Sequence, residues 1–166
     1  FSDKVRIYLC GVTVYDDAHI GHARTIIVFD VLRRFLESQK IPVEFVQNFT
    51  DVDDKIIERA HQEKTPPLEL AAKYTKNYFD DFDSLNVKRA TKYPKATEHI
   101  EDMQNLISNL VDKKYAYVTK NGVYFSVSKF TEYGKLSKKK IDDLVSGARV
   151  AVDEDKNNPI DFALWK

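Results

Sequence analysis

The sequence predicts an α/β fold: a Rossmann-like half-fold with parallel strands, joined to a small mixed α/β insertion that contains a β-hairpin. A strand-like run, a glycine-bearing turn, a helical run and a second strand-like run follow one another before residue 50. This is the order of a βαβ unit, whose crossover makes the two strands parallel. Beyond residue 115 the pattern changes to short apolar runs around Asn121-Gly122, the strongest hairpin signal in the chain.

The βαβ unit is defined by hydrophobic periodicity. Residues 4–9 alternate polar and apolar side chains and end at Cys10-Gly11, as a strand entering a turn does. Residues 21–38 have a wide apolar face, which is typical of an amphipathic helix. Residues 42–49 form the second extended run.

Three more helices are expected after the second strand. The first is capped by Thr50 or Asp51, and the second begins at Thr65-Pro66. Thr97 caps the third. Their predicted apolar positions are Val52, Ile56 and Ala60 in the first, Leu68, Ala71, Tyr74, Tyr78, Phe79 and Phe82 in the second, and Ile100, Met103, Ile107, Leu110 and Val111 in the third. The aromatic row in the second is interpreted as core rather than as a platform for stacking bases.

The remaining chain is expected to form a small lobe. A basic loop occupies residues 135–140, a short helix 141–145, and strands 148–152 and 160–165. We expect two domains, residues 1–94 and 95–166. The last residues, DFALWK, lack a cap or a polar finish, so we expect the chain to be the N-terminal portion of a longer protein.

Composition limits the class of protein. The chain is 43% hydrophobic, enough for a sizeable core, and its 26 basic and 26 acidic residues balance, so no global basic field indicates a nucleic-acid partner. One cysteine cannot form an internal disulfide, and the apolar runs are far shorter than the roughly 20 residues of a membrane span. We expect a cytoplasmic protein without a membrane partner, and a monomer.

The predicted strand-to-helix junction reads CGVTVYDDAHIGH, residues 10–22. The first N–H groups of a helix lack internal partners and its dipole favours negative charge, so a junction opened by Gly21 suits an anion. His19 and His22 would lie together there and could donate hydrogen bonds to phosphate oxygens as charge develops. The alternatives are a solvated or capping pair, and a metal site if further ligands converge.

Cys10 has two interpretations as well. A free cysteine most often behaves as a small buried hydrophobe. However, Cys10 follows the first predicted strand, where open parallel sheets place ligand sites. Zinc needs about four donors, so if Cys10 binds zinc, its partners lie beyond Lys166.

Residues 8–36, YLCGVTVYDDAHIGHARTIIVFDVLRRFL, together with QNFTDVDDKIIERA at 47–60 and NNPIDFALWK at the end, resemble the cysteinyl-tRNA synthetases, a family of class I aminoacyl-tRNA synthetases. The likeness covers essentially the whole chain. HIGH at residues 19–22 is the class I signature, and CGVTVYD and FTDVDDK at their fixed spacing are much more specific.

The resemblance implies ATP-dependent activation of cysteine to cysteinyl-adenylate and its transfer to tRNA(Cys), with Mg²⁺ accompanying ATP. It implies that His19 and His22 are catalytic and bind ATP, and that Gly21 makes room for adenine. Cys10 would be one of four Zn²⁺ ligands, and the zinc would hold the substrate thiol. The matching positions around substrate cysteine are Cys10, Gly11, Thr13 and Thr50.

The family's other three zinc ligands and its KMSKS loop match nothing in this chain, so we expect it to be inactive alone. Three alternatives remain: a cysteine ligase of thiol-cofactor biosynthesis that passes cysteine to an amino sugar, a non-catalytic paralogue that binds nucleotide, and a smaller adenylyltransferase.

Two charged runs keep open interpretations. The acidic run at Asp51, Asp53 and Asp54 is expected to start a helix, with Mg²⁺ binding as the alternative. Residues 137–140, SKKK, are expected to be a solvated loop, with a contact to tRNA phosphates as the alternative. His61 and His99 are assigned no role.

Overall fold

The computed structural model describes residues 4–138 and 156–166, so the predicted helix at 141–145 and strand at 148–152 lie outside the described residues. Contacts divide the chain into two compact units, Phe1–Ile100 and Glu101–Lys166. The sequence predicts a domain boundary after residue 94, six residues before the end of the first unit. That this boundary ends a catalytic half stays a prediction. Among the described residues, no helix is long and apolar enough to cross a membrane.

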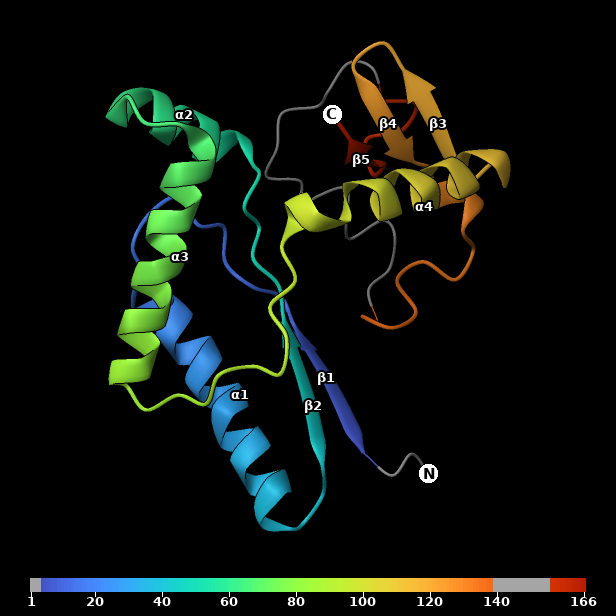
Figure 1. Ribbon diagram of the computed structural model, residues 1–166. Helices are drawn as coiled ribbons and strands as arrows, with labels where there is room; N and C mark the ends of the chain where they lie inside the picture. The colour runs from blue at the N-terminus through green and yellow to red at the C-terminus, as the bar shows by residue number, and fades with distance from the viewer. Residues whose placement is uncertain (1–3, 139–155) are drawn as a thin grey trace. The chain divides into compact units, whose positions relative to one another are not determined.

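The elements are β1 (Val5–Leu9), α1 (Ile20–Ser38), β2 (Val43–Gln47), α2 (Asp54–Glu63), α3 (Pro67–Ser84), η1 (Ala96–His99), α4 (Ile100–Asp112), β3 (Ala116–Thr119), β4 (Gly122–Phe125), η2 (Val127–Lys129) and β5 (Phe162–Trp165) (Figure 1).

The first unit contains the predicted βαβ arrangement. β1 and β2 are parallel, with Val5 opposite Val43 and Leu9 opposite Gln47. The chain returns to the other edge of β2 after α3, where parallel bridges join Val46 to Lys92 and Phe49 to Lys95. Three parallel segments therefore lie side by side, with β2 in the middle.

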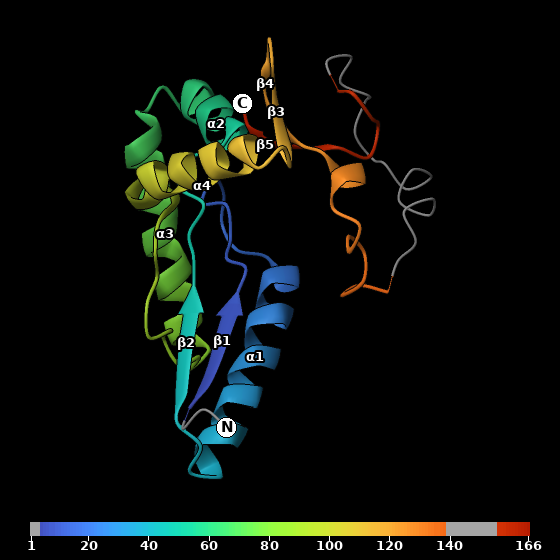
Figure 2. The ribbon, with the colours of Figure 1, turned by 90° about the vertical axis from the view of Figure 1, so that its right-hand side faces the viewer.

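Helices α1 and α3 lie on the same side of this sheet (Figures 1 and 2). The burial of alternate residues agrees, because Phe45 and Gln47 are buried while Arg6 and Tyr8 are exposed. Phe49 is the centre of an aromatic cluster, with its ring 5.0 Å from that of Tyr78. Tyr74, Tyr78 and Phe82 are buried and Phe79 packs against them, which confirms the aromatic row as core, whereas Leu68 is 66% exposed.

Two predicted caps are wrong. The N-cap of α2 is Asp53, whose carboxylate accepts from the N–H of Lys55 at 2.9 Å, so Val52 precedes the helix and is exposed. Thr50 instead pairs with Thr13 in an isolated parallel bridge. The carboxylate of Asp51 is buried and accepts from both the N–H (3.0 Å) and the hydroxyl (2.6 Å) of Thr97. Thr97 thus lies within η1 and serves as a donor to Asp51 rather than as a helix cap.

The second unit contains the predicted hairpin. β3 and β4 are antiparallel with Thr119 opposite Gly122, and β5 adds to β4. A Cβ on Gly122 would lie 2.4 Å from the carbonyl oxygen of Trp165, so glycine here admits β5 as well as beginning β4. No residue of α4 is buried, and the predicted inward position Met103 is 37% exposed.

One buried carboxylate holds this unit together. Asp161 is 2% exposed, and it accepts from the N–H of Val127 (2.9 Å) and from the hydroxyl of Tyr117 (2.8 Å). The same tyrosine oxygen accepts from the N–H of Asn157 at 2.9 Å. Asp161 therefore ties the segment before β5 to the end of the hairpin, which sequence reasoning did not predict.

Candidate functional site

The loop between β1 and α1 carries most of the predicted site residues. It is fixed to the end of β2 by an isolated parallel bridge between Thr13 and Thr50, with backbone hydrogen bonds from Val14 to Thr50 and from Thr50 to Val12. Val14 is 1% exposed and acts as the apolar anchor of the loop. The loop thus extends the parallel arrangement of the sheet beyond its strands.

His19 and His22 form a reciprocal cap at the start of α1. Nδ1 of His19 accepts from the N–H of Gly21 at 3.0 Å, and Nδ1 of His22 accepts from the N–H of His19 at 3.3 Å. The rings stack, with centroids 3.9 Å apart and planes inclined by 21°. The alternative in which the two histidines cap the helix is therefore correct for their Nδ1 atoms, which accept from the backbone.

This cap determines which ring nitrogen faces a ligand. Because both Nδ1 atoms accept from backbone N–H groups, the proton of each neutral ring belongs on Nε2. Burial, and then the neighbouring His19, lower the pKa of His22 from its usual value of 6.5. Near neutral pH, His22 is therefore an uncharged ring with an Nε2–H available to donate.

The predicted anion site needs one correction. The N–H groups of Gly21, His22 and Ala23 are all engaged by His19, the first through its ring and the others through its carbonyl oxygen. Three of the first-turn N–H groups are thus already engaged within the cap. The donors that this junction can offer to a phosphate are the two imidazole Nε2–H groups, supported by the helix dipole.

Gly21 has a local role at this cap. A Cβ at this position would lie 2.8 Å and 2.9 Å from two ring atoms of His19, so only glycine lets the ring fold back over the first turn. The expectation that Gly21 admits adenine stays a prediction.

The residues predicted around substrate cysteine are joined by Asn48, which sequence reasoning missed. The side-chain oxygen of Asn48 accepts from the N–H of Gly11 at 2.7 Å, and its amide nitrogen lies 3.4 Å from the hydroxyl oxygen of Thr50. A Cβ on Gly11 would lie 1.5 Å from the backbone oxygen of Asn48. Gly11 is therefore glycine because the chain after β2 passes directly against it. The signal in the sequence was an amide residue near the end of the second predicted strand, residues 42–49.

Cys10 lies at the end of β1 and is exposed, with Sγ 3.8 Å from the carbonyl oxygen of Gly11. The buried-hydrophobe interpretation is therefore wrong for Cys10. Its thiol is a soft donor of the kind that Zn²⁺ binds, but one donor does not make a zinc site. Among residues 4–138 and 156–166, no three His, Cys, Asp or Glu residues are grouped so as to hold a metal ion.

The acidic run is structural. Asp53 caps α2, Asp51 is occupied by Thr97, and Asp54 lies in the first turn of α2, where its charge complements the helix dipole. The Mg²⁺ alternative is not supported by this arrangement. In the basic run, Ser137 and Lys138 are exposed, and Lys139 and Lys140 lie outside the described residues.

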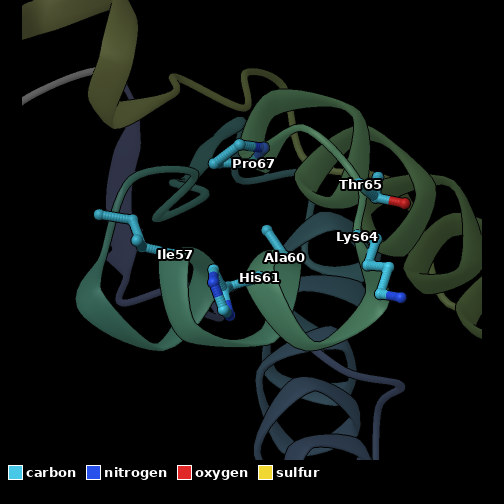
Figure 3. A pocket seen from close by; sticks show the side chains of 6 residues that line it. All are labelled: Ile57, Ala60, His61, Lys64, Thr65 and Pro67. Carbon is cyan, nitrogen blue, oxygen red and sulfur yellow. The ribbon is translucent and has the colours of Figure 1, made fainter.

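The junction contains only a small cavity, and a much larger pocket lies elsewhere in the first unit. A small cavity of about 10 Å³ is lined by Thr13, His22 and Tyr78, together with neighbouring residues. Thr13, predicted to lie near substrate cysteine, and His22, predicted to bind phosphate, therefore line the same cavity. A larger, open pocket of about 450 Å³ lies at the corner between α2 and α3 (Figure 3), and none of the predicted site residues lines it. Its lining residues are Ile57, Ala60, His61, Lys64, Thr65 and Pro67.

The parallel strands and the helices that follow them define a class of protein, the Rossmann-like α/β folds of the class I synthetase type. The crystal structure of Mycobacterium tuberculosis methionyl-tRNA synthetase bound by methionyl-adenylate superposes with a TM-score of 0.64 over 75% of this chain and 25% of that chain. At 20% sequence identity, this likeness shows the fold alone. The family model "tRNA synthetases class I (C) catalytic domain" matches residues 1–166, and the chain belongs to this family.

Curated relatives support the same family at much higher identity. Proteins named Cysteine-tRNA ligase are 58% identical in Thermodesulfovibrio yellowstonii, 57% in Caldicellulosiruptor saccharolyticus and 56% in Aquifex aeolicus, each over 98% of this chain. The match covers 34%, 35% and 33% of those relatives, so the chain spans about a third of their length.

Proposed function

We propose that the full-length protein to which this chain belongs is a cysteine-tRNA ligase. It activates cysteine with ATP to give cysteinyl-adenylate and pyrophosphate, and then transfers the cysteinyl group to tRNA(Cys). The observation that carries this proposal is the stacked histidine pair with two Nε2 donors, in a chain 58% identical to a relative named Cysteine-tRNA ligase.

In this mechanism, the carboxylate of cysteine attacks the α-phosphate of ATP. Negative charge grows on the phosphate oxygens as the bond to pyrophosphate breaks. His19 and His22 donate from Nε2 to those oxygens and stabilise the charge without transferring a proton. Donors fixed in advance by a backbone cap need little reorganisation as the charge develops, which is the basis of this type of catalysis.

We place substrate cysteine beside Gly11, Thr13 and Thr50. Thr13 and Thr50 are joined by the parallel bridge, and Gly11 is held by Asn48 on the same segment as Thr50. Cys10 would supply one Zn²⁺ ligand, and zinc would select cysteine over serine because it binds a thiolate far better than a hydroxyl. Mg²⁺ would accompany ATP. We further propose that the protein is a cytoplasmic monomer, with residues 1–94 in the catalytic half and 95–166 in an insertion.

The test is cysteine-dependent exchange of labelled pyrophosphate into ATP by the full-length gene product, followed by acylation of tRNA(Cys). Exchange with cysteine and not with serine, together with acylation, is the expected result. Transfer to an amino sugar instead of tRNA would favour the thiol-cofactor ligase, and absence of exchange would favour a non-catalytic paralogue. The 166-residue chain alone should show no exchange, and activity above background would contradict the assignment of this chain as an incomplete catalytic unit.

Metal analysis tests the role of Cys10 separately. The full-length protein is expected to contain about one zinc per chain, and Cys10→Ser should lower that content and weaken cysteine binding. Unchanged zinc in the variant would remove Cys10 from the ligand set.

A further inference from the structure

Asn48 contacts three parts of the junction with one side chain. It lies directly after β2, and its Oδ1 accepts from the N–H of Gly11 at 2.7 Å and from the hydroxyl of Tyr8 at 3.0 Å. Its Nδ2 lies 3.4 Å from Oγ1 of Thr50. None of these contacts belongs to the regular hydrogen bonding of the sheet.

The orientation of this amide is fixed by chemistry. A backbone N–H can only donate, so the atom of Asn48 that faces Gly11 has to be the oxygen. The amide nitrogen, which can only donate, then faces Thr50. Asn48 cannot rotate by 180° without placing two donors against each other at Gly11.

This orientation controls the hydroxyl of Thr50. The hydroxyl accepts from Asn48, so its own hydrogen cannot point toward Asn48. Among the described residues, no other group accepts from this hydroxyl. Its hydrogen is therefore free to be donated to a bound acceptor.

We propose that Asn48 is a positioning residue of the amino-acid site, which holds Gly11 in place and directs the hydroxyl hydrogen of Thr50 toward the carboxylate of the bound amino acid. This inference rests on the proposed function, because it takes cysteine as the occupant. Among the polar groups of that substrate near neutral pH, the carboxylate can only accept hydrogen bonds and the ammonium can only donate them. A hydroxyl presented as a donor therefore selects the carboxylate.

The test compares near-isosteric variants of the full-length protein. Asn48→Asp keeps an oxygen facing Gly11 but replaces the donor facing Thr50 by an acceptor, so the hydroxyl of Thr50 should turn and donate to the new carboxylate. We expect the KM for cysteine in pyrophosphate exchange to rise by about tenfold, with the KM for ATP unchanged. Asn109→Asp, the same substitution on the exposed side of α4, is the matched control and should leave both KM values unchanged.

A double-mutant cycle separates the hydroxyl from the added charge. In a Thr50→Val background the hydroxyl is absent, so Asn48→Asp should raise the KM for cysteine little further. An undiminished effect in that background would assign the loss to charge alone and overturn the proposal, as would an unchanged or lowered KM in Asn48→Asp.

A comparison of two Thr50 variants covers the case in which Asn48→Asp does not fold. Thr50→Ser keeps the hydroxyl and should lose much less cysteine affinity than Thr50→Val, and equal effects of the two would overturn the proposal. If the unsubstituted protein shows no exchange with cysteine, the proposed function has failed. If it shows exchange and these variants do not behave as stated, only the role of Asn48 has failed.

Discussion

His19 has two roles that one pair of substitutions can separate. His19→Ala removes the Nδ1 that accepts from the N–H of Gly21 and also the Nε2 donor. His19→Asn also removes the Nε2 donor, but asparagine is among the best N-cap residues and can accept from the same N–H. Loss of an N-cap lowers the free energy of unfolding by about 1 kcal/mol.

Both variants of His19 should lose activity, because an asparagine side chain at this position is too short to replace an imidazole Nε2–H. Removing one donor to developing charge typically lowers the rate by about 100- to 1,000-fold. The assays are pyrophosphate exchange and thermal unfolding of the full-length protein. We expect His19→Ala to lose rate and stability, and His19→Asn to lose rate with nearly normal stability. An active His19→Asn enzyme would show that His19 is only a helix cap and would refute the phosphate role.

Three further predictions concern stability. Gly11→Ala should prevent normal folding, because its Cβ would lie 1.5 Å from the backbone oxygen of Asn48, and a melting temperature equal to wild type would show that this approach can relax. Asp161→Asn should lower the free energy of unfolding in denaturant by about 1–3 kcal/mol, because an amide cannot accept hydrogen bonds at both positions. A turned amide would put its nitrogen against the N–H of Val127. A cost near zero would contradict the role of Asp161 in joining these segments. Because the pKa of His22 is lowered below its unfolded value of 6.5, stability should be full above about pH 6.5 and fall as pH decreases through the folded-state pKa. NMR titration of the ring checks this prediction: a midpoint at 6.5 would remove the effect, and a midpoint above 6.5 would reverse its sign.

The sequence predicted those features that depend on local pattern. Parallel pairing of β1 with β2 followed from two apolar runs joined by a helix, and the hairpin followed from Asn121-Gly122. The proximity of His19 and His22 followed from their spacing at a helix start. Each of these needs only residues that are close in sequence or strands joined by one crossover.

The features that the sequence did not predict depend on contacts between distant segments. Asp51 looked like a helix-capping residue, but it bonds to Thr97, 46 positions away, and leaves the cap to Asp53. Asn48 meets Gly11 across 37 positions, and Asp161 meets Val127 across 34. A polar residue's partner is set by the tertiary fold, so residue type alone could not distinguish a cap or a metal ligand from a link between segments.

Helix α1 is also anchored at the end far from its histidines. Arg33 donates to the carbonyl oxygen of Arg89 and Arg34 to that of Asn86, while Asp30 accepts from the N–H of Lys88. With a rise of 1.5 Å per residue, these anchors lie roughly 20 Å along the helix from the imidazole pair. The histidines and the arginines lie on the same helix. Weakening the hydrogen bonds of Arg33, Arg34 and Asp30 would therefore displace both imidazoles together and preserve their stacking. Under the proposed function, a fault in the alignment of ATP can therefore originate roughly 20 Å from the imidazole pair, at the opposite end of α1.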